Sequence, residues 1–306
     1  MSSDEIYSII QRYAPNNAEI TNKTYASRIN GLLKMGKNID DYSSTTSYLR
    51  SKYKQKTYKS SIIAIVVYLK ALGKMELANK YASEMKRVND IIQDEEKNHV
   101  PTSSEKANMV TNKEKVDIIN NLKDRILHMT VARDYVSYFD TYKRYLVMNL
   151  YHLIPPIRGD FVGCLVYDNP IFFPDLKKNY IYLNTKKLVL NRYKTSKTYG
   201  IGNEVNLPDE LVDIIKKWME IREIVYPRLS GNVELLLTNN LQPMGQVNLT
   251  QFLNRIFQRN VSSTMLRKSY ISEKYPVTHT TNEMQRDATL MQHSVAVQQT
   301  TYRKKM

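Results

Sequence analysis

The apolar residues of the first 90 positions are spaced as in amphipathic helices. In Asn22–Met35 they recur at intervals of three or four, and Thr57–Leu72 and Leu77–Ile92 also carry a periodic apolar face. This spacing is typical of helices that bury one side. Gly36 and Gly73 mark short breaks between these segments. The pattern predicts a compact domain of about four helices in residues 1–92.

A polar stretch then interrupts the pattern. Residues 93–106, QDEEKNHVPTSSEK, contain Pro and Ser and have no apolar periodicity. We interpret them as a linker between two domains. A chain of 306 residues is long enough for two domains of ordinary size.

Residues 107–306 combine helical and β-rich segments. The sequence TNKE, with Thr111 and Glu114, is typical of a helix start. A second helix is expected at Tyr135–Leu153, before Pro155. Later helices are expected at Asp209–Glu223, Leu249–Gln258, Ser262–Lys274 and Asn282–Met291.

Four short segments between these helices have strand character. They are FVGCLVYD, NYIYLN, KLVLNRYK and GNEVNLP, each bounded by turn residues. They predict a small antiparallel sheet that includes a basic hairpin. The expected fold class is therefore mainly α with a small antiparallel β-sheet.

The charge of the chain indicates a polyanionic partner. Lys and Arg number 45 and Asp and Glu 30, which gives a net charge of +15. Lys and Arg bind nucleic acid by displacing counterions from phosphate. Two stretches without acidic residues are predicted to contact DNA: Arg50, Lys52, Lys54, Lys56 and Lys59 in the first, and Lys177, Lys178, Lys186, Lys187 and Arg192 in the second.

Several other classes of protein are excluded. The apolar run Ile62–Leu69 is too short to cross a membrane, and the N-terminal residues lack the pattern of a signal peptide. Cys164 is the only cysteine, so neither an internal disulfide nor a cysteine metal site is expected. No glycine-rich nucleotide-binding motif occurs. We expect a soluble intracellular protein, in a nucleoid, nucleus or viral replication site, without metal or nucleotide cofactor.

Five residues of the second domain form an ordered set. They are Arg158 in PPIRGDF, Lys194 in RYKTSKTYG, Arg267 in STMLRKSYIS, and His293 and Tyr302 in LMQHSVAVQQTTY. Arg158 precedes the strands, Lys194 lies on the basic hairpin, Arg267 lies in a helix, and Tyr302 follows His293 by nine positions. Order, spacing and context together carry more weight than any one of these residues.

This set resembles the tyrosine recombinase superfamily of the phage-integrase type. The resemblance covers residues 107–306, which would form the catalytic domain. Residues 1–92 are similar in a general way to the family's helical core-binding domain, which contacts DNA. The resemblance implies that Arg158, Lys194, Arg267, His293 and Tyr302 are catalytic. It further implies a homotetramer on two double-stranded DNA sites that exchanges strands through a Holliday junction.

The sequence departs from the family pattern in three places. Thr264 stands where the family has the His of HxxR, and Thr is neither an acid nor a base near neutral pH. The family's acidic residue lies three positions after the first Arg, whereas here Phe161 holds that position and the acid is Asp160. Only four residues follow Tyr302, where many relatives have a further helix. Thr264, Asp160 and Lys197 are predicted to support the site.

The residue types suit attack on a phosphodiester without metal or ATP. Two arginines can grip the non-bridging oxygens and stabilise the charge of the transition state. A positioned tyrosine can attack phosphorus, and a lysine can protonate the leaving 5′-oxygen. Histidine can hydrogen-bond the phosphate or manage the tyrosine proton. The expected product is a covalent 3′-phosphotyrosine, which a second 5′-hydroxyl can resolve.

Two alternatives stay open at this point. A type IB topoisomerase or hairpin-forming resolvase would use the same nucleophile with a different religation partner. An inactive, recombinase-derived DNA-binding protein would account for Thr264. The low-glycine composition rich in Lys, Asn, Tyr and Ile suggests an AT-rich genome, such as that of a mobile element or a large DNA virus.

Overall fold

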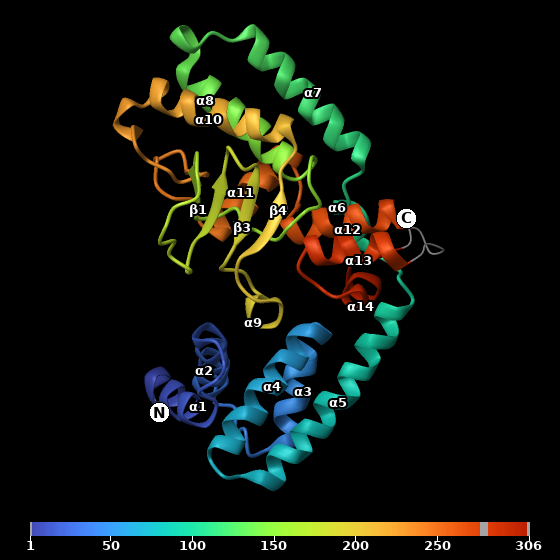
Figure 1. Ribbon diagram of the computed structural model, residues 1–306. Helices are drawn as coiled ribbons and strands as arrows, with labels where there is room; N and C mark the ends of the chain where they lie inside the picture. The colour runs from blue at the N-terminus through green and yellow to red at the C-terminus, as the bar shows by residue number, and fades with distance from the viewer. Residues whose placement is uncertain (1, 276–280, 305–306) are drawn as a thin grey trace. The chain divides into compact units, whose positions relative to one another are not determined.

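The computed structural model describes residues 2–275 and 281–304, and the chain forms two compact units, Met1–Asn98 and His99–Met306. Unit 1 consists of α1 (Ser3–Tyr13), α2 (Glu19–Lys34), α3 (Tyr42–Lys52), α4 (Gln55–Ala71) and α5 (Met75–Lys97) (Figure 1). Helices α2, α4 and α5 cover the periodic stretches in the sequence. Helix α3 lacks an apolar stripe because it is rich in Ser and Thr, and it begins at a cap in which Asp41 accepts from the Ser44 amide at 3.0 Å.

Unit 1 is held together by an apolar core and by one buried carboxylate. Glu84 of α5 accepts hydrogen bonds from Arg87 at 2.9 Å, from Arg50 of α3 at 2.7 Å and from the Tyr58 hydroxyl of α4 at 2.8 Å. Against the effect of burial, Arg87, Arg50 and Tyr58 lower the pKa of Glu84 to about 2. A single side chain thus ties α3, α4 and α5 together.

The segment between the two predicted domains is largely helical. Helix α5 continues to Lys97, and α6 (Ser103–Asn108) lies within unit 2. Glu105 of α6 forms an ion pair with Lys268 of α12 (Ser263–Lys274). The boundary between the units therefore lies at Asn98 and His99, inside the predicted linker.

The remaining described helices of unit 2 surround a small sheet (Figure 1). They are α7 (Asn112–His128), α8 (Val131–Leu150), α9 (Ser196–Tyr199), α10 (Asp209–Val225), α11 (Gln246–Phe257), α13 (Thr281–Leu290) and α14 (Val295–Val297), with a 3₁₀ turn at Pro227–Leu229 and a π-helical turn at Gln298–Tyr302. The helix start predicted at Thr111 is confirmed, since its hydroxyl accepts from the Glu114 amide at 3.1 Å.

The sheet is mixed, so the prediction of a purely antiparallel sheet was wrong. Its order is β1 (Cys164–Tyr167), β2 (Asn179–Tyr182), β3 (Lys187–Leu190) and β4 (Asn203–Asn206). Strands β2, β3 and β4 are antiparallel neighbours, whereas β1 runs parallel to β2, with Cys164 opposite Asn179. Residues 168–178 form a connection long enough to return the chain to the starting end of β1, which a tight hairpin turn cannot do.

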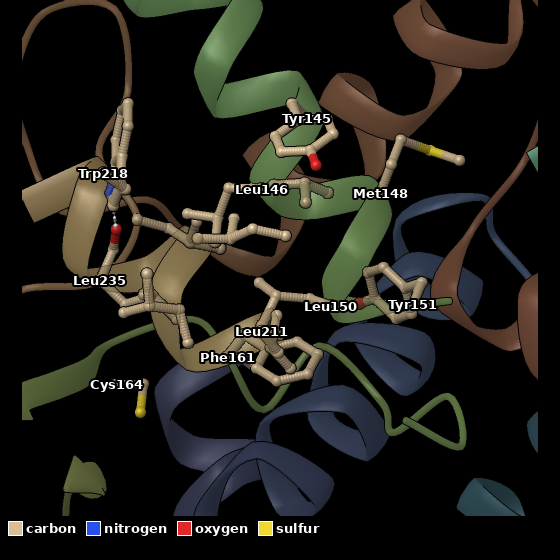
Figure 2. Packing of buried hydrophobic residues seen from close by; sticks show 14 of the residues in the cluster. Tyr145, Leu146, Met148, Leu150, Tyr151, Phe161, Cys164, Leu211, Trp218 and Leu235 are labelled. Atoms are coloured by element: carbon tan, nitrogen blue, oxygen red, sulfur yellow. Dashed lines mark hydrogen bonds between the residues drawn. The ribbon is translucent and has the colours of Figure 1, made fainter. Parts of the chain in front are cut away.

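The core of unit 2 joins the sheet to α8 and α10, which lie side by side (Figure 1). Trp218 of α10 is fully buried, and its indole N–H donates to the Leu235 carbonyl at 2.8 Å (Figure 2). Phe161 packs edge-on against Tyr151 at a centroid distance of 5.6 Å. No described helix is long and apolar enough to cross a membrane.

Candidate active site

Arg267 is the most deeply buried charged group of the site. It lies on α12, whose first turn is capped by Ser262, and its side chain is 0% exposed. One guanidinium nitrogen, Nη2, donates to the Met291 carbonyl at 2.8 Å. Burial lowers the pKa of Arg267 to about 10, so the group stays charged at neutral pH. A buried cation of this kind requires compensation by anions or acceptors.

The Tyr302 ring contacts both Arg267 and His293. The Arg267 guanidinium carbon is 4.6 Å from the centre of the Tyr302 ring, and the His293 ring stacks on Tyr302 with centroids 5.0 Å apart at 25°. Three residues that the sequence separates by up to 35 positions therefore meet in one cluster. This part of the predicted catalytic set is brought together by the fold.

The nine-residue interval between His293 and Tyr302 is occupied by a turn and a short helix. Gln292 adopts the left-handed backbone conformation with φ of 59°, which ends α13. The His293 amide then donates to the Ala288 carbonyl at 3.0 Å, and Ser294 caps α14 by accepting from the Val297 amide at 3.2 Å. The π-helical turn that follows returns the chain so that Tyr302 faces His293.

Arg158 lies in the loop between α8 and β1, held by buried residues on both sides. Ile157 and Phe161 are 1% and 0% exposed, and Arg158 between them is half-buried. Phe161, three positions after Arg158, is a core residue. The neighbouring Asp160 carboxyl is buried, which raises its pKa to about 6 although Arg158 and Arg267 act in the opposite direction. Asp160 therefore lies within the electrostatic reach of both arginines.

Unpartnered polar atoms concentrate at this cluster. Among the described residues, buried nitrogens without a hydrogen-bond partner include Nη1 of Arg158, Nε and Nη1 of Arg267, and both ring nitrogens of His293. Buried polar groups are normally hydrogen-bonded, and each exception calls for an explanation. An anion with several oxygens, such as a phosphodiester, supplies the acceptors and the negative charge that these groups require.

His293 is neutral in this environment. Burial is the main cause, and the positive charge of Arg267 adds to it, so that the pKa of His293 falls to about 3. At neutral pH the imidazole is uncharged and can donate one hydrogen bond and accept another. This charge state favours another residue as the acid of a cleavage reaction.

The segment after Tyr302 is fastened to the same helix that carries Arg267. The Ser272 hydroxyl donates to the Tyr302 carbonyl at 3.4 Å and accepts from the Lys304 amide at 2.8 Å. His99, at the start of unit 2, contacts the Arg303 carbonyl at 3.2 Å and the Arg303 guanidinium at 3.1 Å. These contacts fix the backbone from Tyr302 to Lys304.

Lys194 and Lys197 lie on the loop that joins β3 to β4, and both are exposed. Strand β3 ends at Leu190, so Lys194 lies in the following turn and not at the strand end. Thr264 is exposed near the start of α12, whereas Arg267, one turn later, is buried.

Most of the predicted DNA-contacting residues form ion pairs or hydrogen bonds with residues that are distant in sequence. Lys178 lies 3.8 Å from Glu234, Lys186 lies 2.6 Å from Asp209, and Lys187 pairs with Glu204. In unit 1, Lys56 pairs with Glu96 at 2.6 Å, Arg50 binds Glu84, and Lys59 donates to Asn89. Lys52 instead donates to the Tyr48 hydroxyl at 2.7 Å, and Lys54, Lys177 and Arg192 are exposed.

The sequence did not predict the residues that attach the elements around Arg267, His293 and Tyr302 to one another. Asp287 of α13 accepts from the hydroxyls of Tyr275 and Tyr270 and from Lys274, at 2.6, 2.8 and 2.7 Å, which binds α13 to α12. Ser272 belongs to the same group of supports. Among the described residues, no cluster of His, Cys, Asp and Glu is arranged to hold a metal ion.

No family model matches the chain, and no curated protein matches it.

Proposed function

We propose that this protein is a site-specific DNA recombinase or integrase that cleaves and rejoins DNA strands through a covalent 3′-phosphotyrosyl intermediate. The observation that carries the proposal is the contact of Tyr302 with both Arg267 and His293, in a cluster where buried donors of Arg158 and Arg267 lack acceptors. Tyrosine, two arginines and a neutral imidazole meet the chemical requirements of phosphodiester cleavage.

The reaction assigns a distinct task to each group. Arg158 and Arg267 bind the non-bridging oxygens, and His293 hydrogen-bonds the phosphate. The Tyr302 oxygen forms a bond to phosphorus and loses its proton to water. The bond from phosphorus to the 5′-oxygen breaks, and Lys194 gives that oxygen its proton. Attack by a second 5′-hydroxyl reverses these steps and releases Tyr302.

The partner in this proposal is double-stranded DNA, bound by a homotetramer on two sites. The net charge of +15 and the exposed cations of both units support a polyanionic partner. Burial and Arg267 keep His293 uncharged at neutral pH, which favours a lysine as the acid.

The test is a covalent trap. A pool of duplexes is prepared with a nick a few nucleotides beyond a fixed phosphate, randomised flanks and a 5′ label on the cleaved strand. Cleavage releases a short fragment that diffuses away, so that the labelled strand stays on the protein. We expect a labelled adduct that withstands denaturant and a modified peptide that contains Tyr302.

Tyr302→Phe should abolish the adduct while DNA binding persists, because only a hydroxyl is removed. Tyr199→Phe, on the exposed face of α9, is the matched control and should form adduct normally. Adduct formation by Tyr302→Phe would refute the assignment. Offering the trapped complex either its own strand or a second duplex distinguishes a topoisomerase from a recombinase.

A further inference from the structure

The loop that carries Lys194 is fastened at its first end by a buried amide. Asn179 of β2, 4% exposed, accepts from the amides of Asn191 and Arg192 at 3.0 and 2.8 Å. Its own amide donates to the Arg192 carbonyl at 3.0 Å and to the Asp160 carbonyl at 2.9 Å. Asn179 thus joins the start of this loop to the loop of Arg158.

The second attachment is made by a single hydroxyl next to Lys194. Thr195 Oγ1 donates to the Gln292 carbonyl at 3.0 Å, across 97 positions of sequence. Thr195 occupies the N-cap position of α9, yet its side chain makes no capping bond there. A threonine at this position usually caps its own helix. Here the hydroxyl bonds instead to the turn that precedes His293.

We propose that Thr195 is a positioning residue for Lys194. Its bond to Gln292 holds the Lys194 turn against the turn of His293, so that the lysine ammonium reaches the leaving 5′-oxygen. This inference rests on the proposed function. The step is the one given above: the phosphorus–oxygen bond breaks as the proton of Lys194 moves to the departing oxygen.

The position of the attachment favours Lys194 over Lys197. Thr195 follows Lys194 directly, and Asn179 fixes Arg192 two residues before it, so Lys194 lies between two anchored points. Lys197 lies within α9, and the far end of this helix is attached by the Tyr193 hydroxyl, which donates to the Gly200 carbonyl at 2.7 Å. Thr195 is adjacent to Lys194, so its bond holds the backbone beside this lysine and reduces the conformational freedom that the lysine loses when it acts on the substrate.

The effect of removing the bond follows from this geometry. Thr195→Val keeps the branched shape but removes the donor. We expect about 10- to 100-fold slower cleavage, a part of the ~10²–10⁴-fold that general acid catalysis contributes. Thr195→Ser restores the hydroxyl and should recover most of the rate. Tryptophan fluorescence of Trp218 and circular dichroism check that each variant is folded.

A sulfur-containing substrate distinguishes loss of the acid from general damage. A duplex recovered from the trapping experiment is synthesised with sulfur in place of the scissile 5′-oxygen, because a leaving thiolate needs no proton. We expect Thr195→Val and Lys194→Ala to cleave the sulfur substrate at the wild-type rate, and Arg158→Ala to stay slow on both substrates. Lys216→Ala, at an exposed position of α10, is the matched lysine control and should resemble the wild type on both.

Two results would overturn the role of Thr195 while the proposed function stands. One is wild-type cleavage of the oxygen substrate by Thr195→Val. The other is an equal defect of Thr195→Val on both substrates, which would indicate a structural role. Absence of adduct from the wild-type protein on either substrate would instead overturn the proposed function, and the role of Thr195 with it.

Discussion

The imidazole of His293 stacks on the phenol of Tyr302 with ring centroids 5.0 Å apart. Aromatic pairs prefer an offset or edge-on contact at such distances, and each is worth roughly 0.5–1.5 kcal/mol beyond burial. The same contact excludes water from His293, whose side chain is 3% exposed. The pair therefore fixes both the orientation of Tyr302 and the charge of His293, and both can be tested.

The charge state of His293 predicts a pH-dependent stability. Its pKa is about 3 in the folded protein, below the ordinary value of 6.5, because of burial and Arg267. Below pH 6.5 the unfolded chain takes up a proton that the folded chain does not, so the free energy of unfolding falls as pH falls towards 3. Between pH 7 and 5 this contribution is about 2 kcal/mol.

His293→Gln removes this contribution, so the variant should lose less stability than the wild type between pH 7 and 5. The measurement is urea unfolding followed through Trp218, the only tryptophan, at both pH values. The pH dependence of other groups, including Asp160, is common to both proteins and cancels in the comparison. Identical pH dependence of the two proteins would show that His293 is not held neutral.

Arg267→Lys tests the requirement for a guanidinium. The side chain is fully buried, stacks on Tyr302 and bonds the Met291 carbonyl. An ammonium cannot reproduce this planar set of donors, so cleavage should slow by about 10²–10³-fold. Arg286→Lys, on the exposed face of α13, is the matched control. Near-normal rates of adduct formation by Arg267→Lys would remove Arg267 from the proposed mechanism.

Glu84→Gln should weaken unit 1 selectively. The neutral amide cannot accept the charge-assisted bonds of Arg50 and Arg87, and we expect a loss of about 1–3 kcal/mol. Amide hydrogen exchange should accelerate in α3, α4 and α5 and stay unchanged in α8 and α10.

The pKa of Glu84, about 2 in the folded protein, also predicts a pH dependence of stability. The stabilisation that Glu84 provides in the wild type is present above pH 4.5 and is lost as pH falls towards 2. An unchanged exchange pattern in Glu84→Gln would contradict this assignment.

DNA binding is expected to use both units and to depend strongly on salt. Each neutralised phosphate contributes about −0.9 to the slope of log K against log salt. A fragment of residues 99–306 keeps α6 and its ion pair with Lys268, and it should have a flatter slope than the full chain on the same duplex. Equal slopes would mean that unit 1 does not contact phosphate.

Contacts between residues that are close in sequence can be predicted from their spacing, whereas contacts between residues far apart in sequence cannot. The interval from His293 to Tyr302 is local, and so is the helix cap at Thr111, which the structure confirms. The bond from Thr195 to Gln292 leaves no periodic signal, because either residue alone is an ordinary turn residue. The residues of a short strand also do not indicate whether it runs parallel or antiparallel to its neighbour. Nothing in CLVY therefore predicts that β1 runs parallel to β2.

Charge patterns have the same limitation. Residues 176–200 contain no acid, yet Lys178 and Lys187 pair with Glu234 and Glu204. A stretch without acids in sequence is thus not a surface without acids. The cations predicted to bind DNA have to be weighed by their three-dimensional neighbours, which the sequence does not supply.

The hydrogen bonds between His99 and Arg303 join the two ends of unit 2. The chain of unit 2 thus closes on itself through these two hydrogen bonds, and unit 1 is joined to it at His99. Arg303 directly follows Tyr302, so a pull or twist applied to the chain at His99 is passed to the residue next to the proposed nucleophile. A circular permutant of unit 2 is therefore feasible: a short peptide would join Lys304 to His99, new termini would open in an exposed loop, and the surroundings of Tyr302 would be retained.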